Sequence, residues 1–313
     1  MSIYCIGQSV YDITAAVSED IKPDTKYRFE QYNTCAGGPA LNSACLCSLW
    51  GVETQLVSRI AHDTYGQMVL ASLSDHGVMT DLLIEDSDAE TSFSFIVVNN
   101  KTGERIIFNH PSPYRVVPTK LPNIAPTVIL SDGHEPDATL DLIHAFPEAI
   151  SIVDAGTMRN STMRVAQESE YLICSSAFAQ QYLGHAIDIT SKELSSDLSK
   201  IAQINEGCQV VVTLGSAGLV YLTGNTAVHM PAFNVKVIDS TGAGDIFHGA
   251  FAFGMNAGLS LRDSLILSSM TSAISVTRLG SQTSIPLLKE VLDALDSRGI
   301  ALPLLSNYKS FEA

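Results

Sequence analysis

Short apolar runs alternate with longer helical patterns along most of the chain. Residues 39–50 form one such helical segment, with Pro39 in its first turn and Gly51 directly after its end. Strands that are apolar throughout and separated by helices belong to a parallel sheet that is covered on both faces. The pattern therefore predicts a three-layer α/β fold, with strands over residues 3–7, 55–60, 128–131, 149–154, 171–174 and 209–213.

Polar residues stand at or just after the end of several predicted strands. They are Asp132, Asp154, Ser175 and Thr213. In open parallel sheets, ligands bind outside the carboxyl ends of the strands. Each of these residues alone is typical of a turn, but together they indicate the edge of the sheet at which we expect a site.

Two stretches, about 12–33 and 91–110, break the alternation of strands and helices. They contain short alternating segments, and residues 99–103 between two of these segments are typical of a hairpin connection. We expect a small sheet that stands off the main domain beside the crevice, as a lid or an oligomer contact. A small sheet is marginally stable in water by itself, so we also expect a homodimer that covers the apolar positions Phe93, Phe95, Val97, Ile106 and Phe108.

Composition narrows the class of protein. The chain has 313 residues, 46% of them hydrophobic, and a formal net charge of −15. This length fits a single large domain, and we find no internal repeat or flexible linker. The negative charge argues against nucleic acid or anionic membranes as partners. The six cysteines lack metal-binding spacing, and the first residues lack the features of a signal peptide, so we expect a cytoplasmic protein.

The most informative motif is the segment 239–251. Glycines in a turn let the backbone N–H groups of Gly242, Ala243 and Gly244 converge, and an apolar helical run follows Asp245. Converging N–H groups at the start of a helix bind anions. A carboxylate in such a place competes with a bound phosphate unless it acts as the base that deprotonates an attacking hydroxyl. The alternative is that Asp245 only caps its helix.

Three further features are compatible with this anion site. Gly37, Gly38 and Asn42 stand at the start of a predicted helix, where backbone and amide groups can meet sugar hydroxyls, and Asp12 after the first strand can accept two hydroxyls. The loop that holds Thr213, Gly215, Ser216 and Gly218 follows a strand and allows close approach of a phosphate. Taken singly, each also fits an ordinary helix start or turn.

With these four motifs in this order, the chain resembles the ribokinase-like (phosphofructokinase B type) carbohydrate kinase family over nearly its whole length. The segment 239–245 is similar to the family's second signature, and Gly37-Gly38 with Asn42 to the first. The resemblance implies that Asp245 is the catalytic base and that Gly242, Ala243 and Gly244 form the anion hole. It also implies that Asp12, Gly37, Gly38 and Asn42 bind the sugar.

The same resemblance implies ATP as phosphoryl donor and Mg²⁺ as its metal. Thr213, Gly215, Ser216 and Gly218 would face ATP. In some members, two loops surround a monovalent cation. The segments that contain Asp239, Thr241 and Ser284 resemble these loops, which suggests K⁺.

Within the family, the segment 103–111 is most similar to ketose kinases such as ketohexokinase and sulfofructose kinase. Asn109 then lies where a lid residue touches the substrate. The arginine expected for a sulfonate is absent from residues 131–135, where His134 stands nearest, so a neutral or differently charged sugar is preferred. Residues 175–179 lack the carboxylate of the family's Asn-x-x-Glu motif, which leaves the route of Mg²⁺ binding open.

The sequence thus predicts ATP-dependent phosphorylation of a sugar hydroxymethyl group, with a ketose such as fructose or a derivative as acceptor. A nucleoside kinase of the same fold and an inactive sugar-sensing protein remain alternatives. A dinucleotide-binding protein fits less well, because Phe247 stands where the third glycine of Gly-x-Gly-x-x-Gly belongs.

Overall fold

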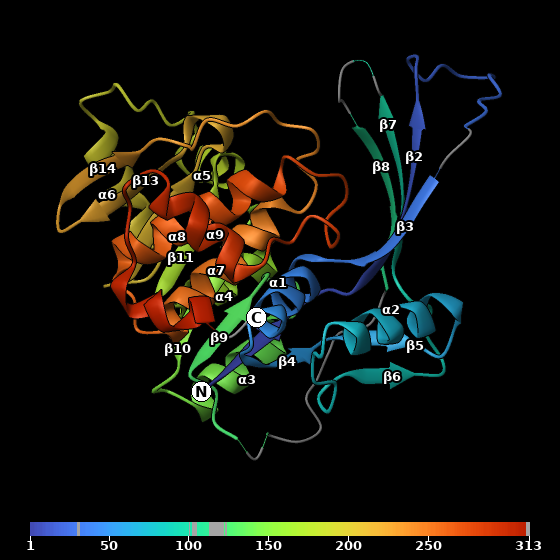
Figure 1. The fold of residues 1–313 in the computed structure, drawn as a ribbon, viewed down its shortest axis with the longest axis horizontal. Helices are drawn as coiled ribbons and strands as arrows, with labels where there is room; N and C mark the ends of the chain where they lie inside the picture. The colour runs from blue at the N-terminus through green and yellow to red at the C-terminus, as the bar shows by residue number, and fades with distance from the viewer. Residues whose placement is uncertain (30–31, 100, 102–104, 113–121, 123, 311–313) are drawn as a thin grey trace.

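A computed structural model describes residues 1–29, 32–99, 101, 105–112, 122 and 124–310. Within these residues, an eight-stranded sheet in the order β14-β13-β12-β11-β10-β9-β1-β4 forms the centre (Figure 1). The strands from β4 to β12 in this order run parallel, and β13 and β14 join antiparallel at the edge. Their bounds are β1 (Ser2–Ile6), β4 (Glu53–Val57), β9 (Val128–Ser131), β10 (Ile150–Ala155), β11 (Tyr171–Ser175), β12 (Gln209–Thr213), β13 (Leu219–Thr223) and β14 (Thr226–Met230).

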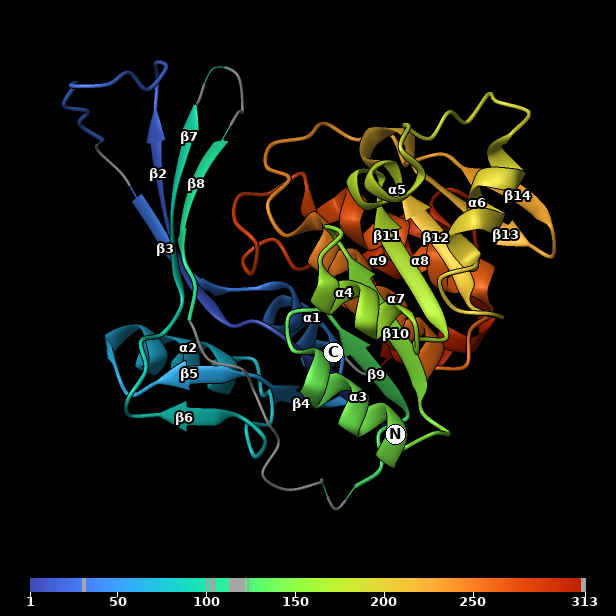
Figure 2. The same ribbon diagram turned by 180° about the vertical axis from the view of Figure 1, so that it is seen from behind.

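Helices cover both faces of this sheet, which confirms the predicted three-layer α/β fold (Figures 1 and 2). Strands buried on both faces need apolar side chains at nearly every position, and Ile3, Ile129 and Val211 are each almost wholly buried. One layer contains α1 (Pro39–Leu49), α7 (Ala243–Asn256), α8 (Leu261–Ser275) and α9 (Leu288–Asp296). The other contains α3 (Pro136–Ala145), α4 (Asn160–Ala166), α5 (Ser176–Leu183) and α6 (Leu194–Ala202).

One predicted strand is divided in two. The apolar run 55–60 was expected to be continuous, but β4 ends at Val57 and β5 (Arg59–Ala61) pairs with β6 (Ile84–Asp86) in a separate sheet. Ser58 between them is fully buried and donates from Oγ to the Gly7 carbonyl at 2.6 Å. This side-chain hydrogen bond satisfies a backbone acceptor at the point where the chain leaves the main sheet.

The predicted small sheet is present and stands beside the main domain (Figure 1). It has the order β3-β2-β7-β8, and we call it the lid sheet. Its strands are β2 (Val10–Val17), β3 (Tyr32–Gly37), β7 (Phe93–Asn99) and β8 (Arg105–His110), and α2 (Thr64–Asp75) packs at its base. The expected hairpin connection 99–103 lies partly outside the described residues. Two short 3-10 helices, η1 (Gly215–Ala217) and η2 (Pro303–Ser310), complete the elements described here.

The register of the lid sheet separates its two faces. Asp12, Ser94 and Asn109 are directly opposite one another on neighbouring strands, so they form a polar row on one face. Ile13, Phe95 and Phe108 form the next row, which belongs to the other face because side chains alternate along a strand. The face with the polar row contains two predicted sugar-binding residues, and farther along it also carries Ile96 and Ile107, whereas the other face is apolar at Phe93, Phe95 and Phe108.

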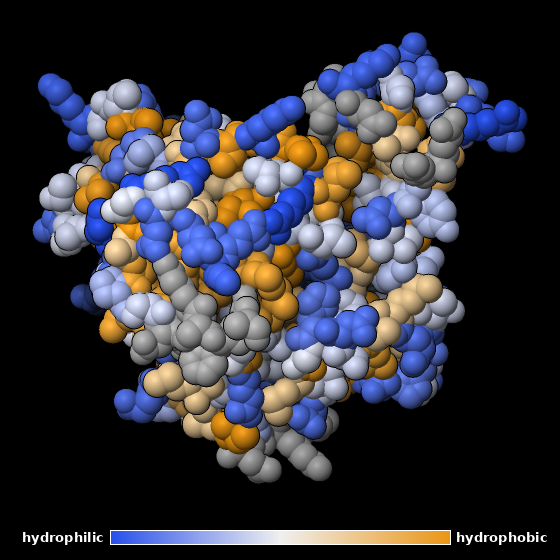
Figure 3. Space-filling view, in the orientation of Figure 1, coloured by the Kyte–Doolittle hydropathy of each residue, from blue (hydrophilic) through white to orange (hydrophobic). Residues whose placement is uncertain are grey.

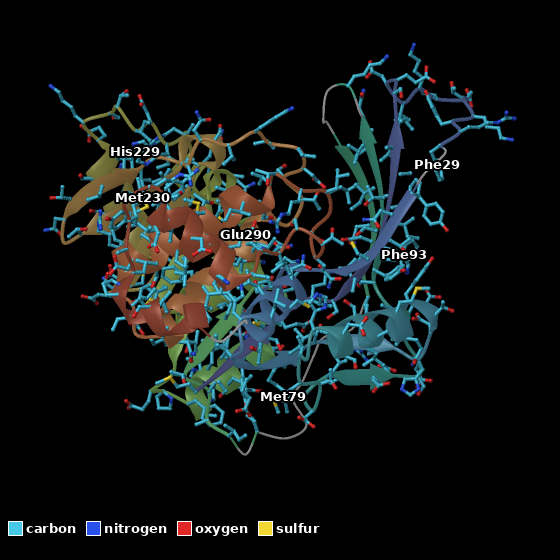
Figure 4. The ribbon with its side chains drawn as sticks, in the orientation of Figure 1. Phe29, Met79, Phe93, His229, Met230 and Glu290 are labelled. Atoms are coloured by element: carbon cyan, nitrogen blue, oxygen red, sulfur yellow. The ribbon has the colours of Figure 1, made fainter. Side chains whose placement is uncertain are left out.

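Part of the apolar face is already covered. The Phe93 ring lies 5.4 Å from the Tyr65 ring of α2, and Figure 4 labels Phe93 where the lid sheet meets this helix. Farther along, Ile106 and Phe108 are 46% and 56% exposed. Figure 3 shows mostly hydrophilic residues at the outer end of the lid sheet.

Candidate active site

Asp245 lies in the first turn of α7 and faces α1. Asn42 of α1 donates from Nδ2 to Asp245 Oδ2 at 2.7 Å, and the Ser43 hydroxyl donates to the Asp245 backbone carbonyl at 2.8 Å. Burial raises the pKa of the Asp245 carboxyl to about 7, and the charge of Asp154 adds to this effect. The two helices therefore hold a carboxyl group that is partly protonated at neutral pH.

The start of α7 requires a glycine at position 242. Gly242 caps the helix in the left-handed region, with φ of 74°, and a Cβ at this position would lie 2.7 Å from Ser281 Cβ. A Cβ on Gly244 would instead meet nothing within 4 Å, so open space lies beside it. The N–H of Ala243 donates to the Ser240 carbonyl at 3.3 Å. The first turn of a helix has no helical acceptors for its N–H groups, so this open side is suited to an anion.

The first glycine pair brings the lid sheet against α1. A Cβ on Gly37 would lie 2.4 Å from Asp12 Oδ2, so only glycine permits this approach of the carboxylate. Gly38 caps α1 with φ of 104°, and a Cβ there would meet the Gln8 carbonyl at 2.3 Å. Burial raises the pKa of the Asp12 carboxyl, and a hydrogen bond with Ser94 partly offsets this effect. Asp12, Gly37, Gly38 and Asn42 thus form one contiguous surface.

Asn109 adjoins this surface through the polar row of the lid sheet. Its Nδ2 donates to Ser94 Oγ at 3.2 Å, and Ser94 in turn contacts Asp12. The antiparallel pairing of β7 with β8, rather than sequence proximity, brings Asn109 here.

The loop predicted to bind ATP follows β12, three strands from β9 in the sheet order. Gly215 has a left-handed φ of 58° and is exposed together with Ser216. A Cβ on Gly218 would lie 2.1 Å from the Met230 carbonyl, so β14 packs tightly under the end of this loop (Figure 4). Thr213 is the last residue of β12, and its hydroxyl donates to the Cys174 carbonyl of β11 at 3.4 Å.

Asp239 joins the two loops for which a monovalent cation was expected. Its Oδ1 accepts from the Thr241 N–H at 2.9 Å and from the Thr241 hydroxyl at 2.7 Å, while Oδ2 accepts from the Gly280 N–H at 2.9 Å. Ser284 is buried, and its hydroxyl bonds to Ser275 Oγ and the Ser281 carbonyl, both at 2.9 Å. These contacts hold the loops together, and a bound cation at this place stays a prediction.

Comparison with known proteins gives the family. The protein family described as pfkB family carbohydrate kinase matches the sequence of residues 1–288. The chain belongs to this family. The match of this carbohydrate kinase to the family includes both helix starts described above.

Three relatives show how far this similarity extends. A ribokinase from Mus musculus is 27% identical over 310 residues, which cover 94% of each chain. A nucleoside kinase from Methanocaldococcus jannaschii is 21% identical over 305 residues, which cover 95% of this chain and 98% of its own. The structure of Arabidopsis thaliana ribokinase complexed with ribose and ATP has the same fold, with a TM-score of 0.79, 22% identity and coverage of 94% and 98%. Two of the three are ribokinases, so the expected nearness to ketose kinases stays a prediction.

Two acidic residues at the strand ends, Asp132 and Asp154, act electrostatically on the Asp245 carboxyl. Asp132 follows β9, and its Oδ2 accepts from the Gln8 N–H at 2.8 Å. A Cβ on Gly7 would lie 2.0 Å from this carboxylate, so the glycine after β1 is required for its approach. Burial alone would raise the pKa of Asp132, but His134 and the backbone N–H groups lower it. The row of polar residues at the strand ends was the sequence signal for Asp132 and Asp154.

Three basic residues beside these carboxylates were not predicted as site residues. Nδ1 of the buried His248, one helical turn after Asp245, lies 3.2 Å from Asp154 Oδ2 and 2.6 Å from the Gly244 carbonyl. Arg159 donates from a terminal nitrogen to His134 Nε2 at 2.8 Å. Sequence spacing gives no signal for these pairs, because each joins segments that meet only in the folded chain.

Proposed function

We propose that this carbohydrate kinase transfers the terminal phosphoryl group of ATP to a hydroxymethyl group of a sugar. The observation that carries the proposal is the half-buried Asp245 carboxyl at the first turn of α7, with a pKa raised to about 7. A base of this pKa is about half ionised at neutral pH and can accept the proton of an attacking hydroxyl. The hydrogen bond from Asn42 fixes its orientation.

The sugar would bind between the lid sheet and α1. Asp12 offers two acceptor oxygens for sugar hydroxyls, while Asn42 and the backbone around Gly37 and Gly38 offer further polar contacts. Asn109 reaches the same surface from β8. Closure of the lid sheet over the sugar would exclude water, which otherwise competes as a nucleophile.

ATP would lie along the loop after β12, with Thr213, Gly215, Ser216 and Gly218 toward it and its terminal phosphate at Gly242, Ala243 and Gly244. Mg²⁺ held mainly by phosphate oxygens needs only one or two protein carboxylates. The described residues contain no group of three or more His, Cys, Asp or Glu side chains arranged to hold a metal ion. The metal would neutralise charge on the phosphoryl oxygens, and the N–H groups of the α7 start would do the same from the protein side.

Three finer expectations belong to this proposal. The acceptor is a ketose such as fructose or a derivative, K⁺ binds at the loops of Asp239 and Thr241, and two copies pair through the exposed apolar positions of the lid sheet. The exposure of Ile106 and Phe108 supports the pairing. No helix among the described residues is long and apolar enough to span a membrane. We propose a cytoplasmic enzyme.

Coupled measurement of ADP release with a panel of acceptors tests the proposal. The panel contains fructose, ribose, adenosine and a reaction without acceptor, each with wild type and Asp245→Asn. We expect acceptor-dependent ADP release with a sugar and its loss in the variant. Equal ADP release with and without acceptors, or an unchanged rate in Asp245→Asn, contradicts the proposed reaction.

A nucleoside kinase is the second candidate. The similarity to the nucleoside kinase of Methanocaldococcus jannaschii favours keeping adenosine in the panel. A specificity constant for adenosine that exceeds those for both sugars would replace the sugar proposal with this one.

A further inference from the structure

His248 places an imidazole ring in the apolar core, one helical turn after Asp245. Its side chain is 5% exposed, and its neighbours on α7, Ile246, Ala250 and Phe251, are fully buried. The Nε2 atom of the ring is buried without a hydrogen-bond partner among the described residues. An unmet polar atom in an apolar core costs free energy, and an apolar side chain would avoid that cost. Packing alone therefore does not explain a histidine at this position.

The other ring nitrogen, Nδ1, joins two segments of the proposed site. It lies 2.6 Å from the Gly244 carbonyl oxygen and 3.2 Å from Asp154 Oδ2. A carbonyl and an ionised carboxylate only accept hydrogen bonds, so Nδ1 carries the proton and donates to both. Gly244 stands in the first turn of α7 beside Asp245, whereas Asp154 stands near the end of β10. One N–H group thus ties the helix start that carries the proposed base to the carboxyl edge of the main sheet.

Asp154 depends on this contact for its place and its charge. Its side chain is 14% exposed, and its recorded ion pair among the described residues is with His248. Burial raises the pKa of the Asp154 carboxyl, and His248 opposes this rise more than any other charged neighbour. The other charged groups that act on it are Asp132, which raises the pKa, and His134 and Arg159, which lower it. Without the donor on α7, this carboxylate would be less firmly placed and more readily protonated.

Asp154 in turn acts on the proposed base. Burial is the largest cause of the raised pKa of Asp245, about 7, and the charge of Asp154 is the next. Asp132 and Asp12 add to the rise, and the hydrogen bond from Asn42 opposes it. A negative charge beside a carboxylate makes it hold a proton more tightly, so Asp154 makes Asp245 a stronger base toward the attacking hydroxyl. Protonation or rotation of the Asp154 carboxyl would remove this effect.

We propose that His248 is a positioning residue for phosphoryl transfer: its Nδ1–H holds the first turn of α7 against Asp154 and keeps the charge of this carboxylate beside Asp245. This inference rests on the proposed kinase function. In that reaction the acceptor oxygen forms its bond to the terminal phosphorus, the bond from this phosphorus to ADP breaks, and the hydroxyl proton passes to Asp245. His248 exchanges no proton with the substrates and acts only through its two acceptors.

Steady-state kinetics measured against pH test this role. His248→Leu removes the donor, His248→Asn places an amide N–H at a similar distance from the backbone, and Asp154→Asn removes the charge. The control is His144→Leu, because His144 also pairs with a carboxylate, Glu168, but stands in the last turn of α3, at the edge of the sheet where β10 begins.

The variants should differ in their pH profiles and in kcat. We expect the rise of kcat/KM with pH to move about one pH unit lower in Asp154→Asn and in His248→Leu, because Asp245 loses a neighbouring charge. His248→Leu should also lower kcat about 10- to 100-fold and leave both KM values nearly unchanged. His248→Asn should recover most of the loss, and His144→Leu should match wild type. The double variant Asp154→Asn with His248→Leu should be no worse than His248→Leu, because both changes remove the same charge.

Three results would overturn this role. One is a pH profile that stays in place in both Asp154→Asn and His248→Leu. Another is a raised KM for the acceptor in Asp154→Asn with an unshifted profile, which would assign Asp154 to sugar binding. The third is an equal loss of kcat in His248→Asn and His248→Leu at wild-type melting temperatures, since the donor would then not matter. If His248→Leu does not fold, the pH profile of Asp154→Asn decides alone.

Failure of the kinase proposal itself is recognised separately, as wild type that releases no ADP with any acceptor. Urea denaturation then still decides the inference, because the stability that Asp245→Asn gains over its parent reports the cost of the Asp245 charge without turnover. At pH 8 this gain should be smaller in an Asp154→Asn background and in a His248→Leu background than in wild type. A gain that is equal in all three backgrounds contradicts the proposed pair.

Discussion

Replacing Asp245 with asparagine should make the protein more stable and almost inactive. The substitution keeps the size of the side chain and an oxygen that accepts from Asn42 Nδ2. It removes the charge that the buried site disfavours. A pKa raised from 3.8 to about 7 corresponds to roughly 4 kcal/mol of lost stability at pH values above 7, since one pKa unit is about 1.4 kcal/mol. Loss of a general base lowers kcat by roughly 10²- to 10⁴-fold.

The difference in stability between Asp245→Asn and wild type should depend on pH. Between pH values of about 4 and 7, the unfolded chain loses the Asp245 proton while the folded chain retains it, so the contribution of this group to stability falls as pH rises. Asparagine stays neutral in both states. Urea denaturation should therefore show Asp245→Asn to be up to about 4 kcal/mol more stable than wild type at pH 8, with a difference that shrinks toward zero at pH 4.

Asp132→Asn is the contrasting control, because Asp132 is buried and the folded structure lowers the pKa of its carboxyl. Its contribution is present above the unfolded pKa and is lost as pH falls, so the variant should be less stable than wild type at pH 8. If Asp245→Asn is also less stable at pH 8, or if its advantage is the same at pH 4, the reasoning from burial of the Asp245 charge is wrong.

Four other outcomes are expected from the same geometry. The kcat/KM should rise with pH through about 7, because Asp245 must be ionised to accept a proton; a flat profile from pH 6 to 8 contradicts this role. Gly244→Ala should keep or slightly raise the melting temperature while it lowers kcat by filling the open space, whereas Gly242→Ala should destabilise through strain and contact with the neighbouring loop. Asp12→Ala should raise the KM for the sugar and leave the KM for ATP nearly unchanged; a selective defect in ATP binding would move Asp12 to the other substrate. Phe108→Glu should give a folded monomer in analytical ultracentrifugation, and a wild type that is already monomeric refutes pairing through the lid sheet.

The fold was predictable where one local signal decides the structure. Apolar runs predict the parallel strands because burial on both faces leaves no other pattern, as in Val128–Ser131. The antiparallel edge strands β13 and β14 were not predicted, and the apolar run across Ser58 was read as one strand. Both depend on where the chain turns, and the buried hydrogen bond of Ser58 that marks one turn forms only with Gly7 in place.

The site residues, too, were predictable only where a local sequence signal exists. The glycines at 37, 38 and 242 are visible in the sequence because close approach or left-handed backbone admits no other residue. Asn109 was expected from the resemblance and its role stays a prediction; the strand register puts it in the same row as Asp12, with Ser94 between them. The contacts of Arg159 with His134 and of His248 with Asp154 join distant segments, so no spacing rule reaches them.

The features that weaken the free protein coincide at the start of α7. The Asp245 charge is largely removed from water, and Asn42 Oδ1 is buried without a hydrogen-bond partner among the described residues. Each costs free energy in the folded state. A sugar hydroxyl would give Asp245 and Asn42 hydrogen-bond partners, and a phosphate would do so for the N–H groups of the helix start. A disfavoured charge and an unmet polar group thus lie where substrates can stabilise them, and ligand binding should raise the stability of this helix end more than that of the sheet behind it.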